Sequence, residues 1–246
     1  MTMQREDSYL IDGSRYERIF RGPRREFVPE DYGFEPKWAI TSCGSGFWCC
    51  YTICENRLIL HELYIHDANE NYPPLNGVEP APTEYIDAIT CRKGVWFKNK
   101  IDRFHGHKAY KDVGLPLDFT GAVLIGRERV QGVPCRILWK VQPCGYRHVL
   151  KLDFENGELI RKTDLSPAAE LQRQRLAKHS DEDARRILWN GNAILDGLPE
   201  QYKEELLCFY RKEPSMPISD EDEIEGETIP LMVEKNEKRV FPKSVV

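Results

Sequence analysis

A group of closely spaced cysteines is the feature of the sequence that most suggests chemistry. Cys43, Cys49, Cys50 and Cys54 lie in one short stretch, and cysteine thiolate is a preferred ligand of zinc. The spacing argues against a zinc site, because no Cys-x-x-Cys pair occurs in the chain. Adjacent side chains on a strand also point to opposite faces. We therefore expect these cysteines to pack as small apolar side chains, and we assign no metal ligand.

The histidines offer a second possibility, either as metal ligands or as a general base. His105 and His107 would share one face of a strand, but charged residues and Gly106 surround them, which is typical of a solvated loop. Ser45 lies between two glycines, yet it lacks the Gly-x-Ser-x-Gly frame of a nucleophile elbow and the Lys-Ser/Thr of a phosphate loop. We therefore assign no catalytic residue and no cofactor.

Composition restricts the class of protein. The chain has 246 residues, 41% hydrophobic and 30% charged, which is the composition of a folded globular protein. Its net charge of -5 argues against a dedicated nucleic-acid binder, which needs surplus Lys and Arg. The first ten residues lack the apolar core of a signal peptide, and no apolar run is long enough for a membrane helix. We expect a cytoplasmic protein whose eight cysteines are reduced.

The elements that must position these residues begin with β-structure. Aromatic and apolar residues up to Cys54, the turn Glu55-Asn56-Arg57 and the run Leu58–Ile65 predict a hairpin. A second hairpin is predicted at Asn156-Gly157, because this dipeptide suits a type I′ turn. Further strands are expected at the following places: Gly94–Lys98, Ala122–Gly126, Arg136–Val141 and His148–Phe154. Short strands without intervening helices predict an antiparallel sheet that forms a barrel or a sandwich.

Helical signals follow the strands. Ser166-Pro167 and Ser180 with Asp183 mark two helix starts, and a third helix is expected from Glu200. The predicted fold class is therefore α+β, an antiparallel barrel or sandwich followed by a C-terminal helical segment. The predicted division is a charged N-terminal arm (1–31), an antiparallel β domain (32–165), a helical segment packed on it (166–212) and an acidic flexible tail (213–246).

Three irregular regions are candidate surfaces for binding another protein. The arm contributes Arg21, Arg24 and Arg25, which would also serve a weaker alternative, contact with RNA or DNA. The long loop Asp67–Pro82 contributes Tyr72 and Asn76. The tail ends in an apolar and basic stretch that contributes Ile229 and Leu231.

A resemblance bears on function. The stretches Ile40–Cys43, Tyr51–Leu60 and Leu150–Leu159, with Asp164-Leu165-Ser166, resemble small bacterial β-rich proteins encoded beside toxin or defence genes. The resemblance implies an immunity-type inhibitor or an accessory subunit of a defence complex, and it carries over no catalytic residue. We expect a non-catalytic protein-binding module. The alternative is a small β-fold enzyme, with or without a metal, whose site lies near Cys43–His61.

Overall fold

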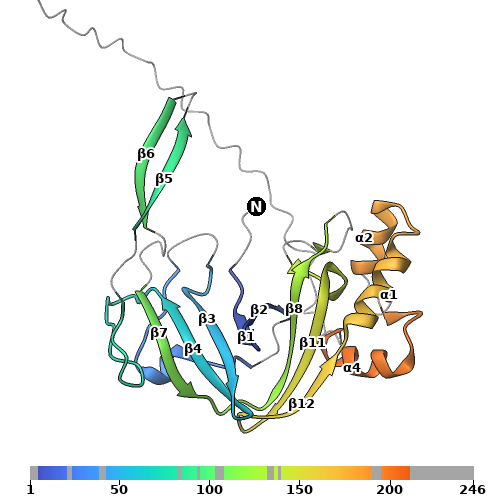
Figure 1. Cartoon of the computed structure of the whole chain (residues 1–246), viewed down its shortest axis with the longest axis horizontal. Coiled ribbons are helices and arrows are strands. Elements are labelled where there is room, and N and C mark those ends of the chain that lie inside the picture. The colour runs from blue at the N-terminus through green and yellow to red at the C-terminus, as the bar shows by residue number, and fades with distance from the viewer. Residues whose placement is uncertain are drawn as a thin grey trace, which may run out of the picture. The chain divides into compact units, whose positions relative to one another are not determined.

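The computed structural model describes residues 5–20, 24–38, 43–81, 85–92, 95–102, 108–131, 136–137, 140–189 and 195–210. Only the backbone is described for 85–92, 95–102, 136–137, 140, 181, 185, 189, 208 and 210. Figure 1 shows the strands and helices. The strands are β1 (Ser8–Ile11), β2 (Ser14–Phe20), β3 (Phe47–Cys54), β4 (Arg57–Ile65), β5 (Tyr85–Arg92), β6 (Val95–Asp102), β7 (Lys108–Pro116), β8 (Gly121–Arg129), β9 (Arg136–Ile137), β10 (Lys140–Val141), β11 (Tyr146–Glu155) and β12 (Glu158–Asp164).

Seven strands close into a barrel in the order β12-β11-β8-β2-β1-β3-β4. Glu158 of β12 pairs with Arg57 of β4 to close it, and β7 pairs with the same edge of β4 beyond this point. The hairpin ends of β3–β4 and β11–β12 meet where the barrel closes (Figure 1). The predicted β-rich fold is confirmed. The expectation of a purely antiparallel sheet is wrong, because β1 runs parallel to β3. A parallel pair needs a long connection, and β2 lies between these two strands in the sequence.

Tight turns with positive φ angles connect the barrel hairpins. Both predicted hairpins are present, with φ of 49° and 62° at Glu55 and Asn56, and 48° and 77° at Asn156 and Gly157. A third turn of this kind, with φ of 49° and 72° at Asp12 and Gly13, joins β1 to β2. Such turns match the right-handed twist of the strands that they connect.

The N-terminal residues are part of the barrel. β1 and β2 pair with each other, with β3 and with β8, so the interpretation of 1–31 as a surface arm does not hold for Ser8–Phe20. The charged residues suggested an exposed segment, but Arg18 lies inside, 3% exposed. The predicted strand Arg136–Val141 likewise differs from the structure, which has two short strands, β9 and β10, paired with each other.

The interior of the barrel is filled by side chains. Residues from the strands form most of this core, and the segments outside the sheet add Phe27, Phe34 and Leu75. Phe34 meets Tyr110 of β7 edge to face, with ring centroids 5.7 Å apart. Two irregular segments therefore complete the core, as expected for a small barrel whose interior positions are occupied.

Helices cover one outer side of the barrel, beside β8, β11 and β12 (Figure 1). They are α1 (Ser166–Leu176), α2 (Asp181–Trp189) and α4 (Glu200–Tyr210), and two short 3-10 helices, η1 (Pro29–Tyr32) and η2 (Pro143–Gly145), lie in the loops. The predicted helix starts at Ser166, near Ser180 and at Glu200 are confirmed. The Asp183 N–H donates to the Ser180 Oγ at 3.2 Å, as a capping box requires.

A second apolar core lies between these helices and the outer face of the sheet. Its members come from both layers: Ile19, Leu124, Cys144, Tyr146, Val149, Leu165, Ala168, Ala169, Leu176, Ala184, Leu188, Leu195, Leu198, Leu206 and Phe209. An ion-pair network adds to it, because Glu205 of α4 contacts Lys151 of β11 at 2.6 Å and Arg161 of β12 at 2.7 Å. The helical segment therefore packs on the β body through both apolar and charged contacts.

By its contacts the chain divides after Arg211, and the predicted tail of 213–246 lies outside the described residues. None of the helices in the described part of the chain combines the length and the apolar character needed to cross a membrane.

Candidate interaction surface

The cysteines form no reactive centre within the described part of the chain. Cys43, Cys49 and Cys50 are buried and only Cys54 is exposed. Burial raises the pKa of the Cys43, Cys49 and Cys50 thiols, which disfavours the thiolate needed for metal binding or nucleophilic attack. Cys49 belongs to the inner core, and His61, the other residue of the enzyme alternative, faces Asp112 of β7 at 3.7 Å.

Among the described residues, no three or more His, Cys, Asp or Glu side chains form a group that could hold a metal ion. His105 and His107 lie outside the described residues. The structure therefore places Cys49 and His61 in different surroundings, one inside the barrel and one beside an exposed carboxylate.

A buried charge cluster lies at one side of the barrel core. The Arg18 Nη1 contacts both Asp7 Oδ2 at 2.9 Å and Glu26 Oε2 at 2.8 Å. The Tyr9 hydroxyl donates to Glu26 Oε1 at 2.7 Å, and the backbone N–H of Cys49 donates to Asp7 Oδ1 at 2.8 Å. One guanidinium is thus shared by two carboxylates. The cluster joins β1, β2 and β3 to residues 24–28.

The two carboxylates leave the cluster one positive charge short when both are ionised. Burial raises the pKa of Glu26, and repulsion from Asp7 adds to this, although attraction by Arg18 opposes it. Burial alone would lower the pKa of Arg18, but its attraction to Glu26 and Asp7 prevails and raises it. Arg18 therefore stays charged, and Glu26 is the member of the cluster that burial pushes toward the neutral form.

Residues 24–38, which we call the 24–38 segment, are held on the barrel by this cluster and by apolar contacts. Phe27 stacks on Tyr32 with ring centroids 5.1 Å apart, and the Arg25 guanidinium lies 4.8 Å from the centre of the Phe47 ring. The far end is fixed by the Lys37 N–H, which donates to the carbonyl of His66 at 2.8 Å. The segment is therefore anchored at both ends.

The outer side of the 24–38 segment is exposed and aromatic. Trp38 is 62% exposed, Tyr32 39% and Val28 37%. Arg24 and Arg25, predicted to bind a partner, are exposed in the same segment. Two of the predicted arginines therefore lie in the same segment of the chain as three exposed hydrophobic side chains.

The other predicted contact residues have different positions. Asn76 Nδ2 donates to the carbonyl of Val113 at 2.8 Å, and the Tyr72 hydroxyl accepts from the N–H of Asp67. Asn76 therefore fixes the 67–81 loop to β7, whereas the hydrogen bond of Tyr72 lies within the loop and its ring packs against the inner core. The remaining predicted residues, Arg21, Ile229 and Leu231, lie outside the described residues.

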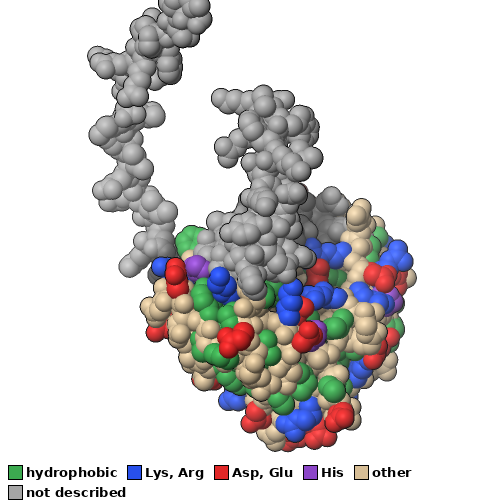
Figure 2. Space-filling view, turned by 60° about the vertical axis from the view of Figure 1, so that its left-hand side comes forward, with side chains coloured by type: hydrophobic (Ala, Val, Ile, Leu, Met, Phe, Trp, Pro, Cys, Tyr) green, Lys and Arg blue, Asp and Glu red, His purple; other side chains and the backbone are tan. Residues whose placement is uncertain are grey.

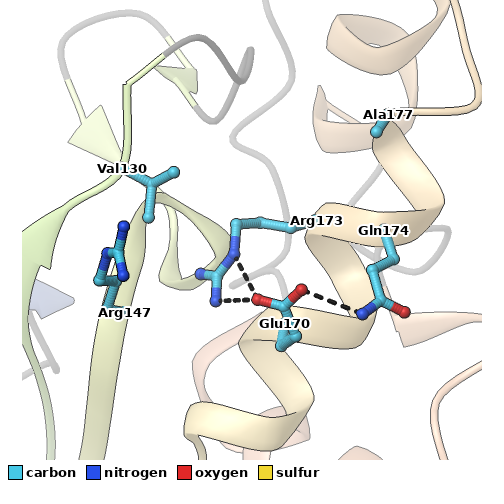
Figure 3. A pocket seen from close by; sticks show the side chains of 6 residues that line it. All are labelled: Val130, Arg147, Glu170, Arg173, Gln174 and Ala177. Carbon is cyan, nitrogen blue, oxygen red and sulfur yellow. Dashed lines mark hydrogen bonds and ion pairs between the residues drawn. The ribbon is translucent and has the colours of Figure 1, made fainter.

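A groove of about 380 Å³ opens between helix α1 and strand β11 (Figure 3). Its lining residues are Val130, Arg147, Glu170, Arg173, Gln174 and Ala177. Polar groups dominate one side of it, where Glu170 accepts hydrogen bonds from both Arg173 and Gln174. No local sequence pattern indicates this groove, because it is formed by residues of a strand and a helix that are separate in the chain.

The surface charge is mixed. Figure 2 shows Lys and Arg side chains interspersed with Asp, Glu and hydrophobic ones on the face that it presents. A nucleic-acid binder concentrates its positive charge along one face. The described surface on this face does not have that arrangement, which agrees with the acidic balance of the sequence.

Comparisons with protein families, curated proteins and solved structures do not identify a relative of this chain, because no family model, no curated protein and no solved structure matches it.

Sequence reasoning missed the charge cluster and the exposed face of the 24–38 segment. A signal for this hairpin was present, since the apolar run Tyr9–Ile11 leads directly into the turn dipeptide Asp12-Gly13. No sequence signal indicated that Arg18 would pair with both Asp7 and Glu26, because that contact depends on the tertiary fold.

Proposed function

We propose that this chain is a non-catalytic module that binds another protein, and that the 24–38 segment is its contact surface. One observation carries the proposal. Three of the five exposed large hydrophobic side chains among the described residues, Val28, Tyr32 and Trp38, lie in this segment. Exposed Arg24 and Arg25 precede them in the same segment. Aromatic residues and arginine are the side chains most enriched at the energetic centres of protein interfaces.

The anchoring of the segment supports this role. The Arg18 cluster and the packing of Phe27 and Phe34 fix the backbone from the inside, so less conformational freedom is lost when the outer side chains bind. Preorganisation of this kind raises affinity without adding contacts. The buried, protonated thiols support a binding role over the enzyme alternative.

The class of partner is proposed from the sequence resemblance. It suggests a toxin or a subunit of a bacterial defence complex, which would make the chain an immunity-type inhibitor or an accessory subunit. An aromatic surface flanked by arginines is suited to a partner patch with an apolar centre and acidic edges.

Copurification of the tagged chain from its native source tests the proposal. We expect a partner in stoichiometric amount, lost with Trp38→Ser or Tyr32→Ser. Ile160→Ser is the matched control, since Ile160 on β12 is 60% exposed, close to the 62% of Trp38, and lies outside the segment. A chain that purifies alone would contradict the binding role. Loss of the partner with Ile160→Ser but not with Trp38→Ser would contradict the assignment of the 24–38 segment as the contact surface.

A further inference from the structure

The groove between α1 and β11 has a rigid polar wall. Glu170 accepts from Arg173 Nε at 3.0 Å, from Arg173 Nη2 at 2.6 Å and from Gln174 Nε2 at 3.0 Å. The same arginine donates through Nη1 to the carbonyl oxygens of Cys144, at 3.0 Å, and of Tyr146. Arg173 itself is 9% exposed. These contacts fix the wall before any ligand arrives.

The negative charge of Glu170 is therefore already stabilised by hydrogen bonds from Arg173 and Gln174. Hydrogen bonds from Arg173, and then from Gln174, lower the pKa of its carboxyl, so it stays ionised and both of its oxygens are in use. The two arginines and one glutamate of the lining leave the groove with one net positive charge. Arg147, the other arginine, also attracts Glu170, but more weakly than the hydrogen-bonded groups do, so the surplus charge is carried by its guanidinium.

Arg147 lies on β11 at the opposite side of the groove, and Figure 3 draws no contact between its guanidinium and the other lining residues. Its side chain is exposed. The nearby carboxylate of Glu128 is directed to Arg127 and His148, each at 3.5 Å. Among the described residues, no hydrogen bond or ion pair links the Arg147 side chain to a protein acceptor.

We propose that this groove binds a carboxylate carried by an acidic, extended segment of another protein, with Arg147 as the donor. A guanidinium matches a carboxylate through two parallel N–H···O bonds, and Val130 with Ala177 offers apolar contact for the methylenes beside it. The site is separate from the 24–38 segment.

A protein carboxylate fits better than a nucleic-acid backbone. A phosphate chain is held by several Lys and Arg side chains in a row, whereas this groove holds a single uncompensated one. Its volume of about 380 Å³ is in the range of sites that enclose a small ligand, which suits one or two side chains of a peptide.

The test uses the full chain and a fluorescein-labelled peptide of sequence Glu-Glu-Leu-Glu-Glu, followed by fluorescence anisotropy at low salt. We expect Arg147→Gln to weaken binding about ten-fold or more, as loss of a charge-assisted hydrogen-bond pair does. Arg57→Gln is the matched control, because it removes the same charge from an exposed position on β4 and should change binding less than about two-fold. Ala177→Trp should also block binding, since it fills the groove and leaves its charge unchanged.

Three results would overturn the proposal. They are wild-type protein that does not bind the peptide, equal losses with Arg147→Gln and Arg57→Gln, and displacement of the peptide by inorganic phosphate at far lower concentration than by acetate. Trp38→Ser should bind the peptide normally, so this experiment and the copurification can fail independently. Thermal unfolding of each variant checks that the fold is retained.

Discussion

At the scale of single residues, Arg18 is the most consequential side chain. It is 3% exposed and holds the carboxylates of Asp7 and Glu26, which arrive from different parts of the chain. A buried charge is costly unless it is paired. The three residues therefore depend on one another, and the 24–38 segment depends on all of them for its position on the barrel.

Substitutions in this cluster should have unequal effects on stability. Arg18→Met leaves two buried carboxylates without a cation, and we expect it to lower the free energy of unfolding by about 3–5 kcal/mol. Glu26→Gln leaves one arginine with one carboxylate and keeps a partner for the Tyr9 hydroxyl, so its cost should be about 1 kcal/mol. Urea denaturation at pH 7 measures both. Equal costs would contradict this account of the cluster.

Wild type and Glu26→Gln should also differ in how their stability depends on pH. Because the pKa of Glu26 is raised above its ordinary 4.5 in the folded state, its contribution to stability is largest below that value and is lost as the pH rises through the folded pKa. The stability of wild type relative to Glu26→Gln should therefore decline as the pH rises from about 4.5. A constant difference between the two proteins across this range would show that folding does not raise the pKa of Glu26.

The buried charge also explains what could not be predicted at this scale. Arg18 interrupts the apolar alternation of β2, and charged residues around it are ordinarily signs of an exposed segment. Only the fold brings Asp7 and Glu26 to it. The exposure of Trp38 could not be predicted either. An aromatic residue next to a β-region usually lies in the core, whereas Trp38 is 62% exposed.

At the scale of elements, the turns decide where the barrel closes. Gly157, at φ 77°, donates its N–H to the carbonyl of Phe119 and accepts from the N–H of Leu58, both within 2.9 Å. It therefore joins the β11–β12 turn to β4 and to the chain entering β8. The turn at Gly13 has a similar φ of 72° and no such neighbours.

These two glycines form a matched pair for substitution. Gly13→Ala should cost about 1–2 kcal/mol, the penalty of a positive φ for a residue with a Cβ, because nothing lies within 4 Å of that Cβ. Gly157→Ala should cost about 1–3 kcal/mol more, since its Cβ would overlap the carbonyl oxygen of Leu117 and force the backbone apart. Thermal or urea unfolding compares them. Equal losses would show that the contact at Gly157 relaxes freely.

Local sequence patterns were sufficient to predict most of the strands and helices. The hairpins at Asn56 and Gly157 and the helix starts at Ser166 and Ser180 depend on residues close in sequence, so their patterns predicted them. The parallel pairing of β1 with β3 joins Ser8 to Cys50, and no local pattern encodes it. The groove at Arg147 escaped prediction for the same reason.

At the scale of the whole molecule, one curved sheet serves two cores. Its inner face holds the barrel core, and its outer face carries Ile19, Leu124 and Val149 under the helices. The helices are therefore part of the fold's stability, even though they follow the barrel in sequence. All described members of both cores precede Arg211.

Truncations should separate these contributions. A chain ending at Leu165 would expose the outer apolar face, and we expect it to aggregate or to bind a hydrophobic dye such as ANS. A chain ending at Arg211 keeps every described residue of both cores and should unfold cooperatively, at a temperature close to that of the full chain. A soluble, dye-negative chain ending at Leu165 would show that the helices are dispensable.

The position of β2 between β1 and β8 has a consequence for biosynthesis. Arg18 pairs with Ile125, so the second edge of the N-terminal hairpin has no partner until β8 has been translated. At about 5–20 residues per second, that wait is on the order of ten seconds. During it the nascent chain carries an open strand edge on β2, and the barrel closes only when Glu158 leaves the ribosome. Slow translation upstream of β8 should therefore favour capture of this protein by chaperones.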